Sequence, residues 1–418
     1  MILRHLERSI SRSLRDTPVV LVNGARQTGK TTLVRSIASK REGTRYVTLD
    51  DAATLSAAQT DPIGFIDGLG EYVVLDEVQK APDLFPALKV AVDRRRKSGR
   101  FLLTGSADVL AMPTLSESLA GRMEPLVLWP LSQGEIAGVE EFFVGAMFAS
   151  RPARPVDSMS ERKDVLNRAM RGGYPSAFRR SEARRRDWFA AYVTTILQRD
   201  VRDLADIEHL SAMPRILSLI AARAGALLNT SELSRTSGLP NSTLQRYLAL
   251  LEHTFLVHLI PAWSSNRSKR LIKTPKVALV DTALLAHLAG ITSGRLRREP
   301  GLVGPLLENF VAVELWKQIG WSSVRVQVFH FRTHGGREVD LVLEADDGRL
   351  VGIEVKASAT ISGRDFAGLE TLREIAGSRF HRGVVLYTGM EVLPFGRRMF
   401  ALPLSALWDM SVSRSGAR

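Results

Sequence analysis

Residues 18–31 of the chain read PVVLVNGARQTGKT. The first six positions predict a short buried strand, because they are mostly apolar and end at a polar asparagine. Residues 24–31 match the pattern G-x-x-x-x-G-K-[ST], and residues 32–40 predict the helix that follows. A strand, a glycine-rich loop and a helix in this order predict a phosphate-binding loop (P-loop) in an α/β sheet.

The chemistry of this loop points to a nucleoside triphosphate with Mg²⁺. Its glycines let successive backbone N–H groups face phosphate, and the helix that begins there adds a partial positive charge. We expect Lys30 to neutralise the β- and γ-phosphates and Thr31 to offer its hydroxyl to Mg²⁺. ATP and Mg²⁺ are therefore the expected cofactors. The expected nucleotide-binding residues are Gly24, Ala25, Arg26, Gln27, Thr28, Gly29, Lys30, Thr31 and Thr32.

A second apolar stretch, residues 72–77, reads YVVLDE and ends in two carboxylates. At the carboxyl end of a sheet strand, Asp76 would face the Mg²⁺ ion beside Thr31, and Glu77 would polarise an attacking water. The two motifs together predict ATP hydrolysis. Lys30 and Glu77 are the expected catalytic residues, and Thr31 and Asp76 the expected metal ligands.

Two later features extend this prediction. Residues 101–106 read FLLTGS, and Thr104 and Ser106 either contact the γ-phosphate or the water, or only cap the strand end. Arg122 stands just before an apolar run at residues 126–128. It is either an arginine finger for a neighbouring subunit or a helix cap. The first alternative predicts a homo-oligomer.

The order of these motifs resembles the AAA+ ATPases. It is similar to one bacterial and archaeal branch in which the ATPase is followed by a C-terminal region of unknown function. The resemblance implies Walker A at residues 24–31, Walker B at residues 76–77 and sensor 1 at residues 104–106. It also implies a role for Arg122 before the fifth strand. Matches in the C-terminal half fall at residues 171–175, 198–201, 281–285 and 354–356.

Length and composition predict an α/β protein of several domains. The chain has 418 residues, and ordinary domains span roughly 100–200. We expect a parallel-sheet ATPase domain at 1–145, a helical lid and winged-helix region at 155–275, and a restriction-endonuclease-like α/β domain at 276–418. The absence of cysteine excludes disulfides and cysteine nucleophiles. Because the chain has no long apolar run, we expect no membrane association. We expect a cytoplasmic location.

The net charge of +13 is unevenly spread. Residues 1–150 carry no net charge, and residues 151–298 carry the whole surplus. A confined excess of this kind indicates an anionic partner, most simply nucleic acid, and we favour DNA. A compositional bias toward arginine is the alternative. The cluster at residues 179–186 either meets an anion or forms a solvated face.

Residues 228–263 predict a winged helix. Helices are expected at 231–236 and 242–253, with Leu244, Tyr247, Leu248 and Leu251 as the core stripe of the second. Polar positions on that helix and a basic wing would contact DNA, although helix–turn–helix shapes also bind proteins. The expected DNA contacts are Ser242, Thr243, Gln245, Arg246, Arg267, Lys269 and Arg270.

The C-terminal part contains a second candidate Mg²⁺ site. Glu308 lies in an expected helix, Asp340 in a strand at 339–343, and Glu354 and Lys356 on one side of the next strand. Asp340 and Glu354 are the expected metal ligands. The set resembles the PD-(D/E)xK nuclease fold, with Glu338 and Val339 before Asp340 where Pro-Asp is usual. The domain is either an active nuclease or a degenerate one used for binding.

Taken together, the residues predict a Mg²⁺-dependent ATPase that binds or acts on DNA through its basic winged-helix region. Two alternatives stay open. One is a nucleotide-gated switch that binds a protein partner with little turnover. The other is a metal-dependent nuclease that ATP licenses.

Overall fold

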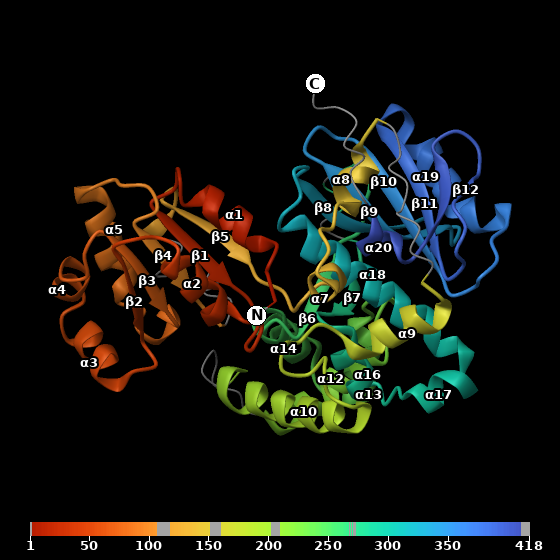
Figure 1. Cartoon of the computed structure of the whole chain (residues 1–418). Coiled ribbons are helices and arrows are strands. Elements are labelled where there is room, and N and C mark those ends of the chain that lie inside the picture. Colours follow the sequence, from red (N-terminus) through yellow and green to blue (C-terminus); the bar gives the residue numbers. More distant parts are fainter. Residues whose placement is uncertain are drawn as a thin grey trace. The chain divides into compact units, whose positions relative to one another are not determined.

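The computed structural model describes residues 2–106, 118–150, 160–201, 210–266, 268, 270 and 273–410. These residues form two compact units (Figure 1). The first unit comprises residues 3–130 with 253–255, and the second comprises residues 131–252 and 256 onward. Among the described residues, no helix is long and apolar enough to cross a membrane.

The first unit is built around a five-stranded sheet in which every paired strand is parallel. The strand order is β2-β3-β4-β1-β5, so the P-loop strand β1 lies between β4 and β5. The strands are β1 (Val19–Asn23), β2 (Thr44–Thr48), β3 (Tyr72–Asp76), β4 (Phe101–Thr104) and β5 (Met123–Val127). The helices are α1 (Leu6–Ser13), α2 (Lys30–Ser39), α3 (Ala52–Thr60), α4 (Pro62–Asp67) and α5 (Leu84–Arg94).

Alternation along β1 explains why this sheet is covered on both faces. Val19 and Leu21 pack in one core cluster together with residues of α5, whereas Val20 and Val22 pack in another with residues of α1 and α2. All four side chains are fully buried. A strand that is apolar at every position needs cover on both sides, which confirms the predicted parallel α/β sheet.

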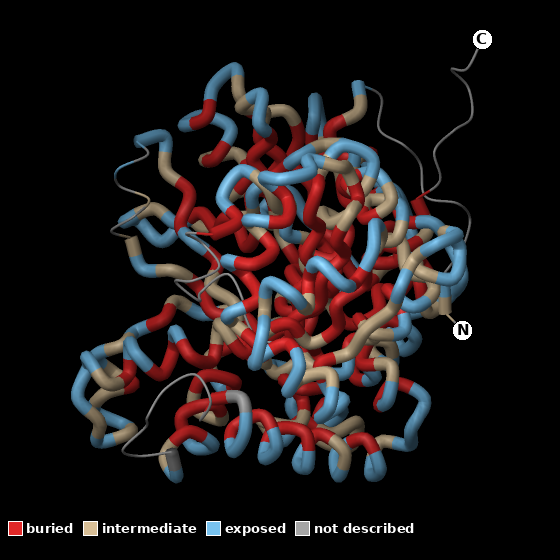
Figure 2. The backbone as a smooth tube through the Cα atoms, turned by 90° about the vertical axis from the view of Figure 1, so that its left-hand side faces the viewer, coloured by how far each residue is buried: buried red, intermediate tan, exposed pale blue. Residues whose placement is uncertain are grey.

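The second unit begins with helices and ends with a mixed sheet. Its helices are α7 (Gln133–Ala137), α8 (Phe143–Phe148), α9 (Arg162–Arg171), α10 (Glu182–Thr195), α12 (Met213–Ala221), α13 (Thr230–Ser237), α14 (Asn241–His253), α16 (Thr282–Leu288), α17 (Ser293–Arg298), α18 (Val303–Ile319), α19 (Ala367–Ala376) and α20 (Ala406–Asp409). A hairpin, β6 (Val257–Ile260) and β7 (Lys276–Leu279), follows α14. Figure 2 shows the buried and exposed stretches along the whole backbone.

The mixed sheet has the order β12-β13-β11-β10-β9-β8. Strands β8, β9 and β10 are antiparallel neighbours, and β11 then pairs parallel to β10. Along the chain, helix α18 precedes these strands and helix α19 connects β10 to β11. The strands are β8 (Val326–Arg332), β9 (Glu338–Ala345), β10 (Leu350–Lys356), β11 (Phe380–Tyr387), β12 (Leu393–Pro394) and β13 (Met399–Pro403).

The first unit ends at residue 130, earlier than the predicted domain end at 145. Buried polar contacts fix the following segment to the second unit. The ammonium of Lys317 donates to the carbonyl of Leu131 over 2.9 Å, and Arg382 donates to the carbonyls of Ala146 and Met147 over 2.8 and 2.9 Å. The predicted middle and C-terminal domains lie together in this unit, so the three-domain division stays a prediction.

Candidate functional site

The P-loop follows β1 and depends on three residues with positive φ. Gly24, Gln27 and Gly29 have φ angles of 143°, 61° and 96°. A Cβ atom at Gly24 would lie 2.3 Å from the backbone oxygen of Leu128, so only glycine fits there. Gly29 is the N-cap of α2, which therefore begins at Lys30 rather than at residue 32 as predicted.

The ammonium of Lys30 is buried against the loop. It donates to the carbonyl oxygens of Gly24 and Ala25, each over 2.8 Å. The hydroxyl of Thr28 also donates to the carbonyl of Ala25, over 3.0 Å. The loop is thus folded around the Lys30 ammonium, the group that we expect to contact phosphate. Arg26 is half-buried, and Thr32 is exposed on the first turn of α2.

Asp76 joins the P-loop helix to two neighbouring strands. Its side chain is buried and accepts hydrogen bonds from the hydroxyls of Thr31 over 2.9 Å, Tyr46 over 2.6 Å, and Thr104. Burial and the hydrogen bond to Asp76 both raise the pKa of Tyr46, so this phenol stays a donor. The predicted ligands Thr31 and Asp76 are therefore in direct contact, with Thr104 and Tyr46 completing the cluster.

The Thr31–Asp76 pair suits Mg²⁺ in chemistry, since both groups offer hard oxygen ligands. Within the described ranges, no group of three or more His, Asp or Glu side chains is arranged to hold a metal ion. A Mg²⁺ ion here would therefore take its other ligands from nucleotide phosphates and water.

Glu77 is held by the sensor residues predicted from the sequence. Its φ of 63° is unusual for a residue other than glycine. Its backbone N–H donates to the hydroxyl of Thr104 over 3.0 Å. The side-chain amide of Gln79 donates to the Glu77 carboxylate and, over 2.8 Å, to the hydroxyl of Ser106. Thr104 therefore contacts the Asp76 carboxylate directly and Ser106 is linked to Glu77 through Gln79, while their contact with the γ-phosphate or the attacking water stays a prediction.

Three contributors to this site were not among the predicted residues. Tyr46 and Gln79 make the contacts described above, and Arg4 braces the loop from the N-terminal segment. The guanidinium of Arg4 donates to the carbonyls of Thr28 and Trp129, each over 2.6 Å. Gln79 had a sequence signal, since it lies two residues after Glu77, but Arg4 stands in no motif.

Arg122 lies near the amino ends of the parallel strands, whereas the P-loop lies at their carboxyl ends. Its carbonyl accepts from the backbone N–H of Val19, at the start of β1, whereas the P-loop follows the end of β1. A five-residue strand spans roughly 13 Å. The guanidinium forms a two-pronged ion pair with Asp93, over 2.7 and 2.9 Å. Arg122 therefore does not contact the P-loop of its own chain, which leaves a role toward a neighbouring subunit as a prediction.

The predicted nuclease-like residues come together in the second unit. Lys356 donates to Glu354 over 2.8 Å, and the backbone N–H of Val355 donates to Asp340 over 3.0 Å. Burial, and then the charge of Asp340, raise the pKa of Glu308 to about 8 and that of Glu354 to about 7. Three carboxylates from α18, β9 and β10 therefore lie in one region, in which Asp340 is buried and Glu308 is partly exposed.

A lysine that the sequence did not single out sits among them. The ammonium of Lys276, on β7, lies 3.1 Å from Asp340, 3.0 Å from Glu338 and 3.9 Å from Glu308. Its side chain is only 3% exposed. Burial opposes its charge, but the carboxylates, Asp340 first, outweigh that effect and raise the pKa of Lys276.

The helix–turn–helix segment has the predicted core stripe. Leu244, Tyr247, Leu248 and Leu251 are buried on α14. Asn229 caps α13, because its side chain accepts from the backbone N–H of Glu232 over 3.0 Å. The predicted DNA contacts Ser242, Gln245 and Arg246 are exposed and Thr243 is half-buried.

The predicted wing differs from a free basic loop. Arg267 and Lys269 lie outside the described residues. Arg270 is described, and its guanidinium pairs with Glu344 on β9 and donates to the carbonyl of Ser264 over 2.7 Å. Its side chain is only 10% exposed. Arg270 therefore serves an internal ion pair, and contact with a phosphate would require breaking it.

Comparison with known proteins agrees with this layout. Residues 16–137 match the AAA domain family. Residues 162–295 and 303–407 match two domain families of unknown function, DUF8612 and DUF4143. Among solved structures, AMPPCP-bound DnaA from Aquifex aeolicus is similar with a TM-score of 0.30 and 13% identity, covering 60% of this chain and 89% of that one.

Two relatives have no described activity. An uncharacterized protein of Haemophilus influenzae is 26% identical over 260 residues, which is 60% of this chain and 58% of the relative. The uncharacterized protein Rv2008c of Mycobacterium tuberculosis is 32% identical over 397 residues, which is 94% of this chain and 82% of the relative. The chain therefore belongs to the same family as Rv2008c, and its residues 16–137 match the AAA domain family.

Proposed function

We propose that the chain is a Mg²⁺-dependent ATPase that hydrolyses ATP at the P-loop. The observation that carries this proposal is the hydrogen-bonded cluster around Asp76, which brings Thr31, Tyr46 and Thr104 to one carboxylate. Such a cluster fixes the carboxylate before a ligand arrives, so little reorganisation is needed on binding. Mg²⁺, when bound, would neutralise charge on the phosphates.

This proposal gives each of the site residues a definite role. Lys30 would move its hydrogen bonds from the loop carbonyls to the β- and γ-phosphates. Thr31 and Asp76 would hold Mg²⁺. Glu77 would accept a proton from the attacking water, with Gln79 and Ser106 orienting its carboxylate. Arg122 would serve a nucleotide on a neighbouring subunit of a homo-oligomer.

The experiment that tests this function is phosphate release from ATP by the purified full-length chain, with Mg²⁺ and after its chelation. Release that depends on the metal supports the ATPase. ATP binding without release favours the alternative, a nucleotide-gated switch that binds a protein partner.

We further propose nucleic acid, with DNA favoured, as the macromolecular partner of the ATPase. The surface that supports this is formed by α10 and α17, which run along the lower side of the second unit in Figure 1. Glu182 at the start of α10 accepts from the backbone N–H and the hydroxyl of Ser293 at the start of α17, over 3.0 and 2.6 Å. The exposed arginines of this surface are Arg179, Arg180, Arg184, Arg186, Arg297 and Arg298.

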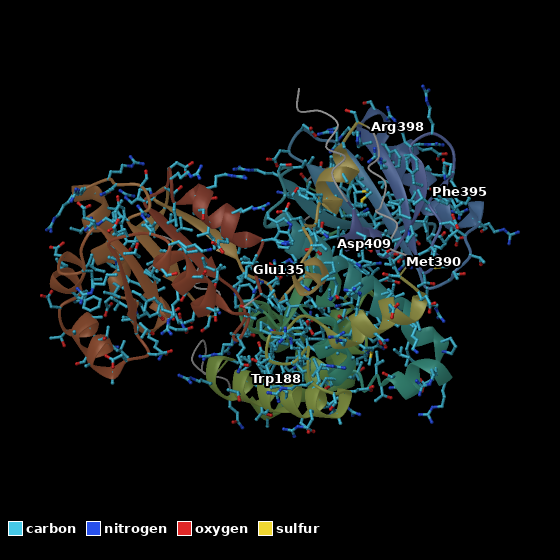
Figure 3. The ribbon with its side chains drawn as sticks, in the orientation of Figure 1. Glu135, Trp188, Met390, Phe395, Arg398 and Asp409 are labelled. Carbon is cyan, nitrogen blue, oxygen red and sulfur yellow. The ribbon has the colours of Figure 1, made fainter. Side chains whose placement is uncertain are left out.

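Three of these arginines have no ion-pair partner among the described residues. Arg184 pairs with Asp187 over 3.1 Å, but Arg186, Arg297 and Arg298 form no ion pair with any described residue. Exposed arginines without ion-pair partners are available to an anion, and a phosphodiester backbone is such an anion. Trp188 lies on α10 (Figure 3), and its ring is stacked on that of Tyr192 with ring centroids 5.0 Å apart. This surface is better supported than the wing, where Arg270 is buried.

Reversing two charges on this surface, Arg297→Glu with Arg298→Glu, is expected to weaken DNA binding. If each arginine meets a phosphate, the slope of log affinity against log salt should fall by about 2. Titrations of labelled duplex DNA at several salt concentrations measure this.

The matched control is Arg12→Glu with Arg15→Glu, two exposed arginines of the first unit that, like Arg297 and Arg298, form no ion pair with a described residue. An equal loss in both double variants would mean that only total charge matters, which contradicts the proposed surface. A loss in Arg246→Glu alone would instead favour the helix–turn–helix contacts predicted from the sequence.

A further inference from the structure

The residues that resemble a nuclease site do not fit the divalent metal that such a site implies. Both oxygens of Asp340 are already engaged. Oδ1 accepts from the ammonium of Lys276 over 3.1 Å, and Oδ2 accepts from the backbone N–H of Val355 over 3.0 Å. One oxygen of Glu354 accepts from Lys356. The other is buried and has no hydrogen-bond partner among the described residues.

The ammonium of Lys276 lies among three of the carboxylates, including the expected metal ligand Asp340. This ammonium is within 4 Å of oxygens on Glu308, Glu338 and Asp340. A Mg²⁺ ion would need these oxygens at about 2.1 Å, and it cannot share their centre with a nitrogen. A divalent ion placed nearby would also be repelled by the ammonium in a region where water screens little.

The backbone of Lys276 is anchored from both sides. It pairs with Ile260 across the β6–β7 hairpin and forms an isolated bridge with Leu227. The adjacent Val277 exchanges backbone hydrogen bonds with Gly225 and Ala226, over 2.9 and 3.3 Å. With its strand fixed and its side chain 3% exposed, the ammonium is held in place against Asp340.

We propose that Lys276 takes the place of the catalytic metal, so that the C-terminal domain binds no divalent cation at Asp340 and performs no metal-dependent cleavage. The cluster instead forms an internal set of ion pairs that ties the β6–β7 hairpin to β9 and to helix α18. A buried carboxylate that lost Lys276 would be left uncompensated, so the cluster also selects this packing of the hairpin.

The first test compares wild type with Asp340→Asn in Mn²⁺ binding, measured by electron paramagnetic resonance on the full chain without nucleotide. We expect the two proteins to bind the same number of Mn²⁺ ions. A site present in wild type and lost in Asp340→Asn would overturn the proposal. Because no ATP is present, the result is independent of the ATPase.

The second test removes the ammonium by Lys276→Met, which keeps the length of the side chain. We expect a gain of one Mn²⁺ ion per chain, and a loss of that ion in the double variant with Asp340→Asn. The control is Lys273→Met, which should gain no site. A folded Lys276→Met protein that gains no Mn²⁺ overturns the proposal, and if this variant fails to fold, the first test decides alone.

Discussion

Replacing Glu77 with glutamine is expected to slow ATP hydrolysis by about 100- to 10,000-fold, the usual contribution of a general base. ATP affinity should stay as in wild type, because neither Lys30 nor the P-loop backbone is changed. Glutamine keeps the size and the hydrogen-bonding reach of the side chain toward Gln79. Phosphate release and the binding of a fluorescent ATP analogue measure the two quantities.

The control for this variant is Glu42→Gln, since Glu42 is exposed on the same unit. It should leave both quantities unchanged. Hydrolysis that continues at the wild-type rate in Glu77→Gln would assign the base elsewhere, while a common loss of ATP binding would show damage to the loop rather than to the chemistry.

Replacing Gly24 with alanine is expected to weaken ATP binding at the P-loop. The new Cβ would lie 2.3 Å from the carbonyl oxygen of Leu128, and both atoms are positioned by backbone that cannot yield easily. The loop must therefore move away from β5. We expect ATP affinity to fall at least about tenfold, which is ~1.4 kcal/mol. We also expect ~1–3 kcal/mol less stability toward unfolding from the overpacking.

Gly43→Ala is a matched control because it separates the clash from the backbone strain. Gly43 also has a positive φ, 74°, but an added Cβ would meet nothing within 4 Å. It should lose only about 1–2 kcal/mol and bind ATP normally. Calorimetry and nucleotide titration compare the two variants. Equal stability and equal ATP affinity in both would show that the approach to Leu128 does not matter.

The sequence predicted the first unit well because its signals are continuous along the chain. The P-loop, the helix after it and the strand that ends at Asp76 are each encoded within a few residues, and their types follow from local apolar patterns. The contacts of Tyr46 and Arg4 could not be predicted in this way. They depend on β2 lying beside β3 and on the N-terminal segment folding back to Thr28.

In the second unit, too, the contacts that the sequence did not predict join residues that are distant along the chain. Glu308, Asp340, Glu354 and Lys356 were found from their local spacing, but Lys276 is 64 residues before Asp340. Its role appears only when β7 packs against the sheet. Arg270 was expected on an exposed wing because its neighbours are basic. Its partner Glu344 is 74 residues away, and that distant pairing buries the charge.

We propose that Thr31 and Asp76 position Mg²⁺ for ATP hydrolysis at the P-loop. Steady-state phosphate release from ATP by the wild-type chain tests this proposal, first with Mg²⁺, then with excess chelator, then with Mg²⁺ restored. We expect release to stop on chelation and to return with the metal. Absence of release under all three conditions, or release that chelation leaves unchanged, would overturn the proposal.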